Sequence, residues 1–308
     1  MPTLSHSARV TGTPDPGPYG LDSPEAYRSW RQRRLDAYPC QPSELVVPIA
    51  DPLRLTPEEK AGLVRTLRTY NMAIYQLREP AASSKGMVLA LGGALGLHRV
   101  DQNLCSDEDS VSALEVRDTG RAHSYIPYTS RRLRWHTDGY YNDPGHRIRS
   151  FILHCVRPAA TGGENDLMDP EIAFILIHDT DPELSRALMA PDAMTIPANI
   201  EEGRQVRPEQ SGPVFEFDPA DGRLLMRYSA RGRNIVWRDD AATRAAVARL
   251  NEIMDRDSPY VIHHRLEAGQ GLLSNNVLHA RAAFEDGREP ARRRLLYRAR
   301  YYDRIRGT

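Results

Sequence analysis

The 308-residue sequence predicts a mostly β protein with inserted helices, built on a double-stranded β-helix core of the jelly-roll or cupin-like kind. Short β-rich runs dominate from Arg134 onward, and helical patterns stand between them at irregular intervals. Histidines suited to one shared site lie far apart, at His136 and His279, and such a barrel brings distant strands together at its open mouth. The alternative is a mixed α/β sheet, but strands and helices do not alternate regularly enough for repeated parallel βαβ units.

The amino-terminal part of the chain is predicted to be mainly helical. Residues 1–20 are rich in Pro, Gly, Ser and Thr, and we expect them to be mobile, with a single domain covering residues 21–308. Ser23-Pro24-Glu25 and Thr56-Pro57-Glu58-Glu59 each indicate a helix start, because a capping residue precedes a proline at the first helical position. A strand at 73–75 and a short helix at 87–97 are expected to follow.

The rest of the chain is predicted to be rich in strands. The polar, irregular stretch 107–125 precedes the strand that holds His136, so it is a candidate substrate lid. Asp221-Gly222 predicts the turn of a hairpin. Strands are expected at residues 148–156, 165–168, 214–217, 224–228, 260–266, 271–274 and 295–302, and helices at 169–176, 181–189 and 240–256.

His136 and Asp138 stand two residues apart, so on a β-strand both side chains leave the same face. Together with the distant His279 they form the ligand set of a facial triad, which leaves three positions of a ferrous ion open for substrate and dioxygen. A His-x-Asp pair also occurs by chance. The alternative interpretation of each histidine is an ordinary surface or core residue.

A series of arginines follows His279, at residues 292–294, 298 and 300. In an alternating strand Arg294, Leu296 and Arg298 share one face, so two guanidiniums can point inward near the metal. Arginine matches a carboxylate with two parallel hydrogen bonds and stays charged when buried, which suits a dianionic cosubstrate. The alternative is a basic, solvated edge strand carrying all five arginines, and for Arg292 and Arg293 that interpretation is the better one.

With these motifs the sequence resembles a known family, the iron(II)- and 2-oxoglutarate-dependent dioxygenases of the taurine dioxygenase (TauD/TfdA) and gamma-butyrobetaine hydroxylase type. The resemblance extends roughly from Leu55 to Asp303. Its motifs occur in the order typical of the family: Tyr128-Thr129 through His136-Thr137-Asp138, then Leu153-His154-Cys155, then Thr161-Gly162-Gly163-Glu164-Asn165, and finally the segment from His279 to Arg298.

The resemblance implies roles for individual residues. The three triad residues would bind iron(II), Arg294 would hold the distal carboxylate of 2-oxoglutarate, and Arg298 would lie beside cosubstrate and substrate. Asn165 stands where taurine dioxygenase has a cosubstrate-binding threonine, and its amide can still donate a hydrogen bond. The spacing from His279 to Arg294 is longer than usual in the family, so the choice among Arg293, Arg294 and Arg298 depends on strand register.

The function implied by the resemblance is an oxygenase that uses iron(II), 2-oxoglutarate and dioxygen, releases succinate and carbon dioxide, and hydroxylates an unactivated C–H bond of a small polar molecule. One rival is a cupin-type metalloprotein that acts as a hydrolase or isomerase without 2-oxoglutarate. Another is a non-catalytic barrel that only binds a ligand. The inward arginine pair disfavours the first rival, and the intact ligand set disfavours the second.

Residues near these motifs also carry expectations. Tyr140, Tyr141 and Asn142 follow the triad strand into a loop at the barrel mouth, where substrate contact and a purely structural role are both open. Trp135 is expected to face away from the metal and pack in the core. The remaining expectations are a hydrogen-bonded core position for His154, a sheet position for His263-His264, and a polar loop for Arg204 and Arg207.

Composition limits the partners and the location. Lys+Arg and Asp+Glu both number 41, so the formal net charge is zero and predicts no nucleic-acid or membrane partner. Three cysteines without paired spacing suit a reducing cytoplasm, and they give no zinc-binding domain like that of gamma-butyrobetaine hydroxylase. No apolar run approaches a membrane span, and residues 1–20 lack the pattern of an export signal. We expect a cytoplasmic enzyme with a small-molecule substrate, and a homo-oligomer, dimer or tetramer, as its assembly.

Overall fold

The computed structural model describes residues 23–39, 41–102, 110–117, 125–218, 221–231, 235–255 and 258–308. The segment expected to be mobile, residues 1–20, lies outside the described residues. So does most of the candidate lid at 107–125.

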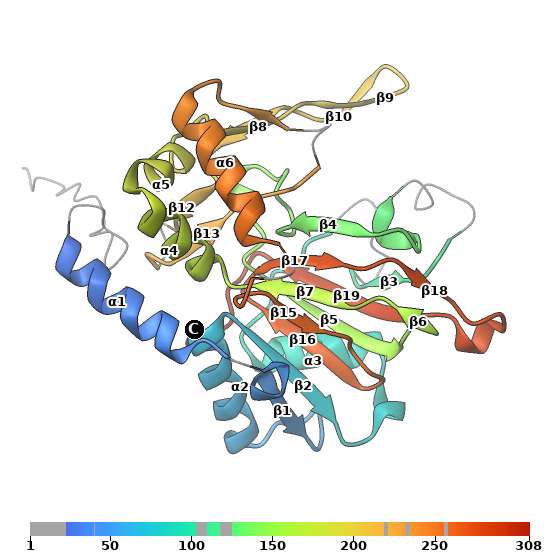
Figure 1. Cartoon of the computed structure of the whole chain (residues 1–308). Coiled ribbons are helices and arrows are strands. Elements are labelled where there is room, and N and C mark those ends of the chain that lie inside the picture. The colour runs from blue at the N-terminus through green and yellow to red at the C-terminus, as the bar shows by residue number, and fades with distance from the viewer. Residues whose placement is uncertain are drawn as a thin grey trace, which may run out of the picture.

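Two β-sheets form the centre of the molecule and pack face to face (Figure 1). The larger sheet has the strand order β1-β2-β16-β5-β19-β3, and the smaller one has the order β15-β7-β17-β4. The larger sheet consists of β1 (Val46–Ile49), β2 (Met72–Leu77), β3 (Ser112–Leu114), β5 (Ser150–Arg157), β16 (Gln270–Ser274) and β19 (Leu295–Tyr301). The smaller consists of β4 (Leu133–His136), β7 (Asn165–Met168), β15 (Ile262–His264) and β17 (Leu278–Arg281). All of these pairings are antiparallel except that of β1 with β2.

Helices cover the outer face of the larger sheet, which explains the continuous apolar pattern of its central strands. The first six residues of β5 are all buried. The β5 side chains on the outer face of the sheet pack with α2 (Pro57–Tyr70) and α3 (Lys85–Ala94) in one apolar cluster. The β5 side chains on the inner face pack against the smaller sheet in a second apolar cluster. The predicted capping box at Thr56 and Glu59 is present at the start of α2.

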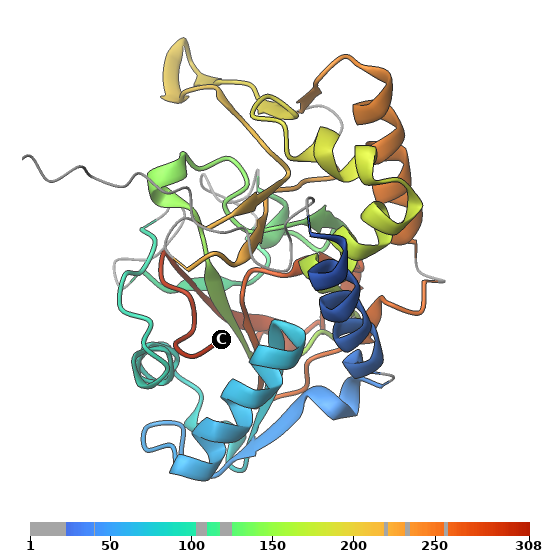
Figure 2. The same cartoon turned by 90° about the vertical axis from the view of Figure 1, so that its left-hand side faces the viewer.

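A second group of helices packs beside the smaller sheet (Figure 2). It consists of α1 (Pro24–Ala37), α4 (Pro170–Thr180), α5 (Pro182–Leu188) and α6 (Ala241–Ile253). Aspartate side chains accept hydrogen bonds from backbone N–H groups in the first turn of three of these helices: Asp169 at α4, Asp181 at α5 and Asp240 at α6. No helix in the described part of the chain is both long and apolar enough to cross a membrane.

For the small strands around residues 194–237, one prediction from the sequence is confirmed and one is wrong. The expected hairpin is present as β12 (Phe215–Phe217) paired with β13 (Leu224–Met226). The polar loop expected for Arg204 and Arg207 is wrong, because these residues form β10 (Arg204–Arg207), which pairs with β9 (Asn199–Glu201). Further strands in the described residues are β6 (Thr161–Gly162), β8 (Met194–Ile196), β11 (Gln210–Gly212), β14 (Val236–Trp237) and β18 (Phe284–Glu285).

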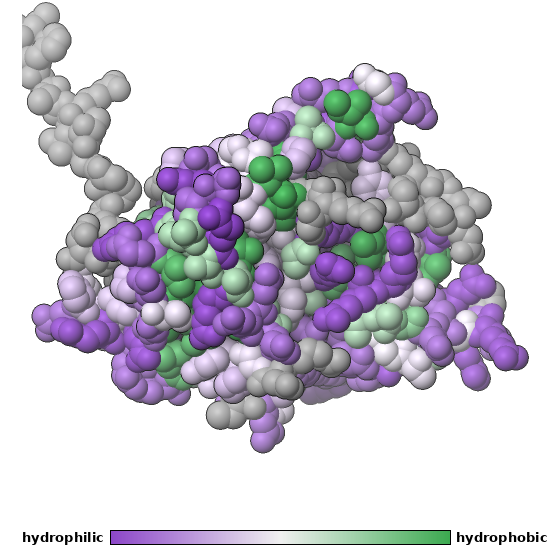
Figure 3. Space-filling view, turned by 45° about the horizontal axis from the view of Figure 1, so that its top comes forward, coloured by the Kyte–Doolittle hydropathy of each residue, from purple (hydrophilic) through white to green (hydrophobic). Residues whose placement is uncertain are grey.

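Hydrophilic side chains predominate on the face of the molecule that Figure 3 shows. Hydrophobic residues appear there as small separate spots. The large hydrophobic side chains that are exposed in the described residues are Leu53, Ile200 and Val236.

Candidate active site

The structure brings His136, Asp138 and His279 together, with one ligand atom of each within 4.8 Å of the others. His136 ends β4, and the antiparallel register pairs it with His279 on β17, so both rings leave the same face of the sheet. Asp138 lies in a turn just beyond the strand rather than on it. It still reaches the histidines, because Thr137 continues the extended path by donating its N–H to the Tyr228 carbonyl over 3.0 Å.

Both histidines are held in the form that binds a metal. The Nδ1 atom of His136 lies 2.9 Å from the carbonyl oxygen of Arg134. The Nδ1 atom of His279 lies 2.9 Å from the carbonyl oxygen of Val277. A carbonyl can only accept, so Nδ1 carries the proton and Nε2 is left with a free lone pair. Burial and the neighbouring His279 ring lower the pKa of His136 to about 3, and burial lowers the pKa of His279 as well. Both rings are therefore neutral at neutral pH.

Asp138 completes the donor set as an ionised carboxylate. Burial raises its pKa, but Arg298, Arg300 and the two histidines together bring it below its ordinary value. Its Oδ1 accepts a hydrogen bond from Arg298 Nη1 at 3.3 Å, whereas its buried Oδ2 has no hydrogen-bond partner among the described residues. A buried anionic oxygen without a donor, facing two free Nε2 lone pairs, fits a divalent metal ion.

Asn276 fixes the backbone of Asp138. Its Oδ1 accepts from the Asp138 N–H at 2.8 Å, and its Nδ2 donates to the carbonyl of Asp138 at 3.0 Å and to that of Ile148 at 2.7 Å. This residue has φ 56°, in the left-handed region that Asn and Gly tolerate. Asn276 received no role from the sequence alone.

Changing Asn276 to glycine is expected to weaken iron(II) binding about ten- to a hundredfold, because groups that orient metal ligands contribute that much to metal affinity. Glycine keeps the left-handed backbone and removes only the amide. The matched control is Asn275→Gly, whose amide contacts Asn71 and Thr308 instead. Anaerobic iron(II) titration and thermal unfolding would measure both variants. Equal iron affinity in the two variants would contradict this role.

Strand β19 carries a row of inward-facing arginines. Arg294 and Arg300 are buried and Arg298 nearly so, whereas Arg293 is exposed. The pairing of β19 with β5 shifts by one residue at Leu295 and Leu296, and the extra residue lies in β5. The side chains along β19 therefore alternate between its two faces without interruption. The register in which Arg294 and Arg298 face inward is therefore the observed one.

Arg300 received no inward role from the sequence, where only the alternative of a solvated edge strand included it, and the structure buries it. Its guanidinium pairs with Asp101, and its Nη1 donates to the hydroxyl of Tyr141 at 3.1 Å. Burial lowers the pKa of Arg300, but Tyr141, Asp138 and Asp101 more than reverse this effect. The alternation that placed Arg298 inward also applies to Arg300, two residues further along the strand.

Arg294 and Asn165 lie away from the cavity that opens at the triad. The Arg294 guanidinium lies over the Phe284 ring, 5.0 Å from its centroid, and donates to no carboxylate among the described residues. Burial lowers its pKa to about 10, so it remains charged at neutral pH. Asn165 is buried in β7, where its Nδ2 donates to the His264 carbonyl at 3.3 Å.

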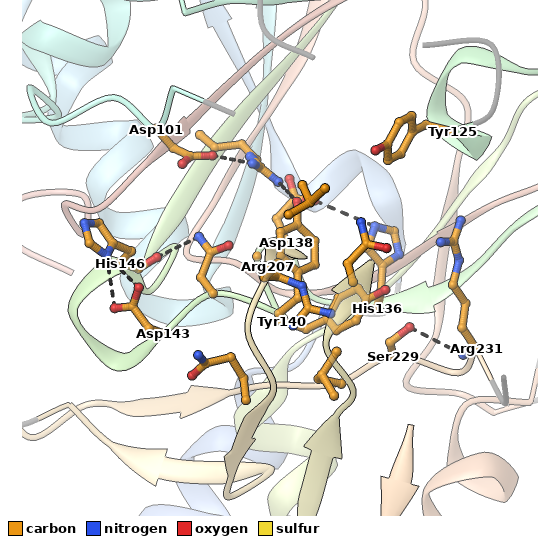
Figure 4. Close-up of a pocket in the computed structure, with 18 of the residues that line it drawn as sticks. Asp101, Tyr125, His136, Asp138, Tyr140, Asp143, His146, Arg207, Ser229 and Arg231 are labelled. Atoms are coloured by element: carbon orange, nitrogen blue, oxygen red, sulfur yellow. Dashed lines mark hydrogen bonds and ion pairs between the residues drawn. The ribbon is translucent and has the colours of Figure 1, made fainter. Parts of the chain in front are cut away.

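A cavity of about 700 Å³ opens at the triad. Tyr140, Tyr141 and Asn142 line it, as does Arg298, and Figure 4 shows Tyr140 near His136 and Asp138. The ring of Tyr141 also lies under the guanidinium of Arg207, 5.9 Å from it, which ties the β9–β10 hairpin to this wall.

The sequence expectations for Trp135, His154 and the pair His263-His264 are confirmed. Trp135 is buried in the core. His154 is a core histidine that contacts the Tyr75 hydroxyl at 2.9 Å and the Ser83 hydroxyl at 2.8 Å. His263 and His264 lie in β15, in the sheet.

Comparisons with known proteins agree with this geometry. Residues 35–300 match the model of the family described as "Taurine catabolism dioxygenase TauD, TfdA family". A uridine-5'-phosphate dioxygenase from a Streptomyces species is 32% identical over 247 residues, which cover 76% of this chain and 86% of that protein. A uridine-5'-phosphate dioxygenase from an Amycolatopsis species is 32% identical over 179 residues, and that match spans 56% of this chain and 62% of the relative.

The fold has a solved counterpart. The structure of an asparagine oxygenase in complex with Fe(II), 2S,3S-3-hydroxyasparagine and succinate superposes with a TM-score of 0.57 at 19% identity, covering 79% of this chain and 78% of that one. At this identity the likeness concerns the fold alone, a mostly β architecture with inserted helices.

The family match, together with a donor set that could hold an iron ion, defines the class as a non-haem iron oxygenase. The chain belongs to the TauD/TfdA family, and it is a dioxygenase that depends on iron(II) and 2-oxoglutarate. The hydrolase, isomerase and non-catalytic alternatives are accordingly not favoured.

Proposed function

We propose that this dioxygenase hydroxylates a C–H bond of a small phosphorylated nucleoside of the uridine 5'-phosphate kind. The observation that carries the proposal is the 32% identity to a uridine-5'-phosphate dioxygenase over 86% of that protein's length. The cavity supports it, because about 700 Å³ lies within the range of small-molecule sites and is large enough for a nucleotide. Five arginines line the cavity, which favours an anionic ligand: Arg134, Arg207, Arg231, Arg298 and Arg300.

We assign the iron ligands to His136, Asp138 and His279. The two Nε2 lone pairs, and the Asp138 oxygen that has no hydrogen-bond partner within the described part of the chain, support this assignment. We assign the distal carboxylate of 2-oxoglutarate to Arg294, with Asn165 as a further donor. The support is the buried guanidinium of Arg294, which has no side-chain acceptor among the described residues. Arg294 lies just before β19, four residues from Arg298.

The bound iron and 2-oxoglutarate supply the oxidising power, with succinate and carbon dioxide as products of the cosubstrate. The protein's own share is positioning and charge compensation. Arg298 lies against Asp138 and faces the cavity, where it can balance the carboxylates of ligand and cosubstrate. Tyr140, Tyr141 and Asn142 form the wall that contacts the substrate and excludes water from the metal.

The test is succinate formation from 2-oxoglutarate across a panel of nucleotides, nucleosides, amino acids, sulfonates, betaines and carboxylates. Uridine 5'-phosphate or a close analogue is expected to stimulate succinate release and to gain one oxygen atom by mass spectrometry. Stimulation by a sulfonate or an amino acid, with none by any nucleotide, would remove the proposed substrate.

Several further properties belong to the same proposal. The two packed sheets support a double-stranded β-helix core, and residues 21–308 would form a single dioxygenase domain around it. The zero formal charge supports an enzyme without nucleic-acid or membrane partners, located in the cytoplasm. A dimer or tetramer is the proposed assembly.

A further inference from the structure

Arg134 lies in β4, and Arg231 lies in the segment that runs alongside the end of β4. An isolated antiparallel bridge pairs His136 with Ser229. It is flanked by the hydrogen bond from the Ala230 N–H to the Trp135 carbonyl at 2.8 Å. In an antiparallel pair the two chains run in opposite directions, so residues before one partner lie at the same end as residues after the other. Arg134 lies two residues before His136 and Arg231 lies two residues after Ser229, so the antiparallel direction of the bridge brings both to the same end of the paired segment.

Both arginines border the cavity that reaches His136 and Asp138. The pairing of β4 with β17 has a register shift between Leu133 and His136, so it is the cavity lining, and not strand alternation, that places Arg134 beside the metal site. Two residues of strand amount to roughly 7 Å, so the pair lies close to the metal but not in contact with it. Both residues line the cavity, and Figure 4 shows Arg231 on the His136 side, extending toward Tyr125.

The charges of these two arginines are uncompensated within the described residues. Neither guanidinium has a hydrogen bond or ion pair there, whereas the other arginines of the cavity are engaged. Arg298 contacts Asp138, and Arg300 pairs with Asp101. Arg207 donates to the carbonyls of Pro197 and Pro208 at 2.6 and 2.9 Å.

Two like charges in one cavity repel each other, and a dianion bound between them turns that repulsion into attraction. Each guanidinium offers a planar pair of donors that matches the oxygens of a phosphate. Because the cavity continues from this pair to the triad, a ligand held here by its phosphate can present a carbon atom to the metal.

We propose that Arg134 and Arg231 form the subsite that binds the phosphate group of the substrate. This inference rests on the proposed function for the organic part of the substrate, but the subsite itself requires only a phosphate dianion. The pair would thus select a nucleotide over the corresponding nucleoside, a selection that neither the triad nor Arg294 can make.

The test compares Arg134→Gln and Arg231→Gln with the wild type, all as anaerobic iron(II) and 2-oxoglutarate complexes. Calorimetry with uridine 5'-phosphate is expected to show about ten- to a hundredfold weaker binding in each variant, the usual effect of losing a charged hydrogen-bond partner. The affinities for uridine and for 2-oxoglutarate are expected to stay unchanged. Arg204→Gln is the matched control, because Arg204 is exposed and does not line the cavity.

A second probe, inorganic phosphate, separates failure of the subsite from failure of the proposed substrate. If phosphate binding is lost in both variants while uridine 5'-phosphate is never turned over, the subsite stands and the substrate proposal falls. If both variants bind phosphate and uridine 5'-phosphate as tightly as the wild type, the subsite is overturned, whatever the substrate. Equal weakening by Arg204→Gln would also overturn it, since only the general field of the protein would then matter.

Discussion

Replacing His279 with alanine will abolish the consumption of 2-oxoglutarate, and so will the corresponding changes at His136 and Asp138. Three protein donors converge on one point, and two remaining donors cannot hold iron(II) against water and competing metals. The loss is expected in both the iron content of the purified protein and the rate of succinate formation, measured after reconstitution with excess iron(II).

The control for this variant is His263→Ala. It removes the same ring from β15, where His263 pairs with Asp166 at 2.7 Å, away from the triad. That variant should retain iron binding and turnover. Thermal unfolding of both proteins separates loss of metal from loss of fold. Turnover at the wild-type rate by the His279→Ala enzyme would show that the triad is assigned to the wrong histidine.

The periodicity of strands predicted much of this site. Arg294 and Arg298, four residues apart, needed only alternation along a strand to be placed on an inner face. Asp138 was expected on the same strand as His136 and lies instead in the turn beyond it, from which it still reaches the histidines. Arg300 belongs to the row of arginines. It received no inward role from the sequence, because its partners, Asp101 and Tyr141, precede it by 199 and 159 residues, and only the folded chain brings them together.

The β9–β10 hairpin shows a second kind of limit. Its two turn residues, Glu202 and Gly203, have φ of 50° and 78°, as a tight hairpin requires. The usual sequence signal for such a turn is Asn-Gly or Asp-Gly, and Glu-Gly is a weaker one. The flanking strands are only partly buried, so they lack the apolar alternation that revealed the strands of the core.

The position of Asn276 could not be predicted for a similar reason. Its role depends on the turn that carries Asp138, 138 residues earlier in the chain. The neighbouring Asn275 has the same side chain and contacts the carboxyl-terminal Thr308 instead. Two adjacent asparagines therefore look equivalent in the sequence and serve different parts of the fold.

Changing Arg294 to alanine will weaken the binding of 2-oxoglutarate by about one to two decades in affinity. A charged hydrogen-bond partner contributes about 1.5 to 3 kcal/mol, which corresponds to that range. Lysine at position 294 is expected to restore part of the loss, because a point charge reproduces the attraction but not the two parallel hydrogen bonds. Titration of 2-oxoglutarate into anaerobic iron-loaded protein, followed by the metal-to-ligand charge-transfer band, measures each variant.

Arg293→Ala is the matched control for Arg294. It removes the same side chain from the next residue, which is exposed and whose carbonyl accepts from Arg157 Nε at 3.0 Å. Because that contact uses the backbone, the truncation should leave cosubstrate affinity nearly unchanged. If Arg293→Ala weakened binding and Arg294→Ala did not, the distal carboxylate would lie on the other face of β19, and Arg298 would lose its assigned place beside the cosubstrate as well.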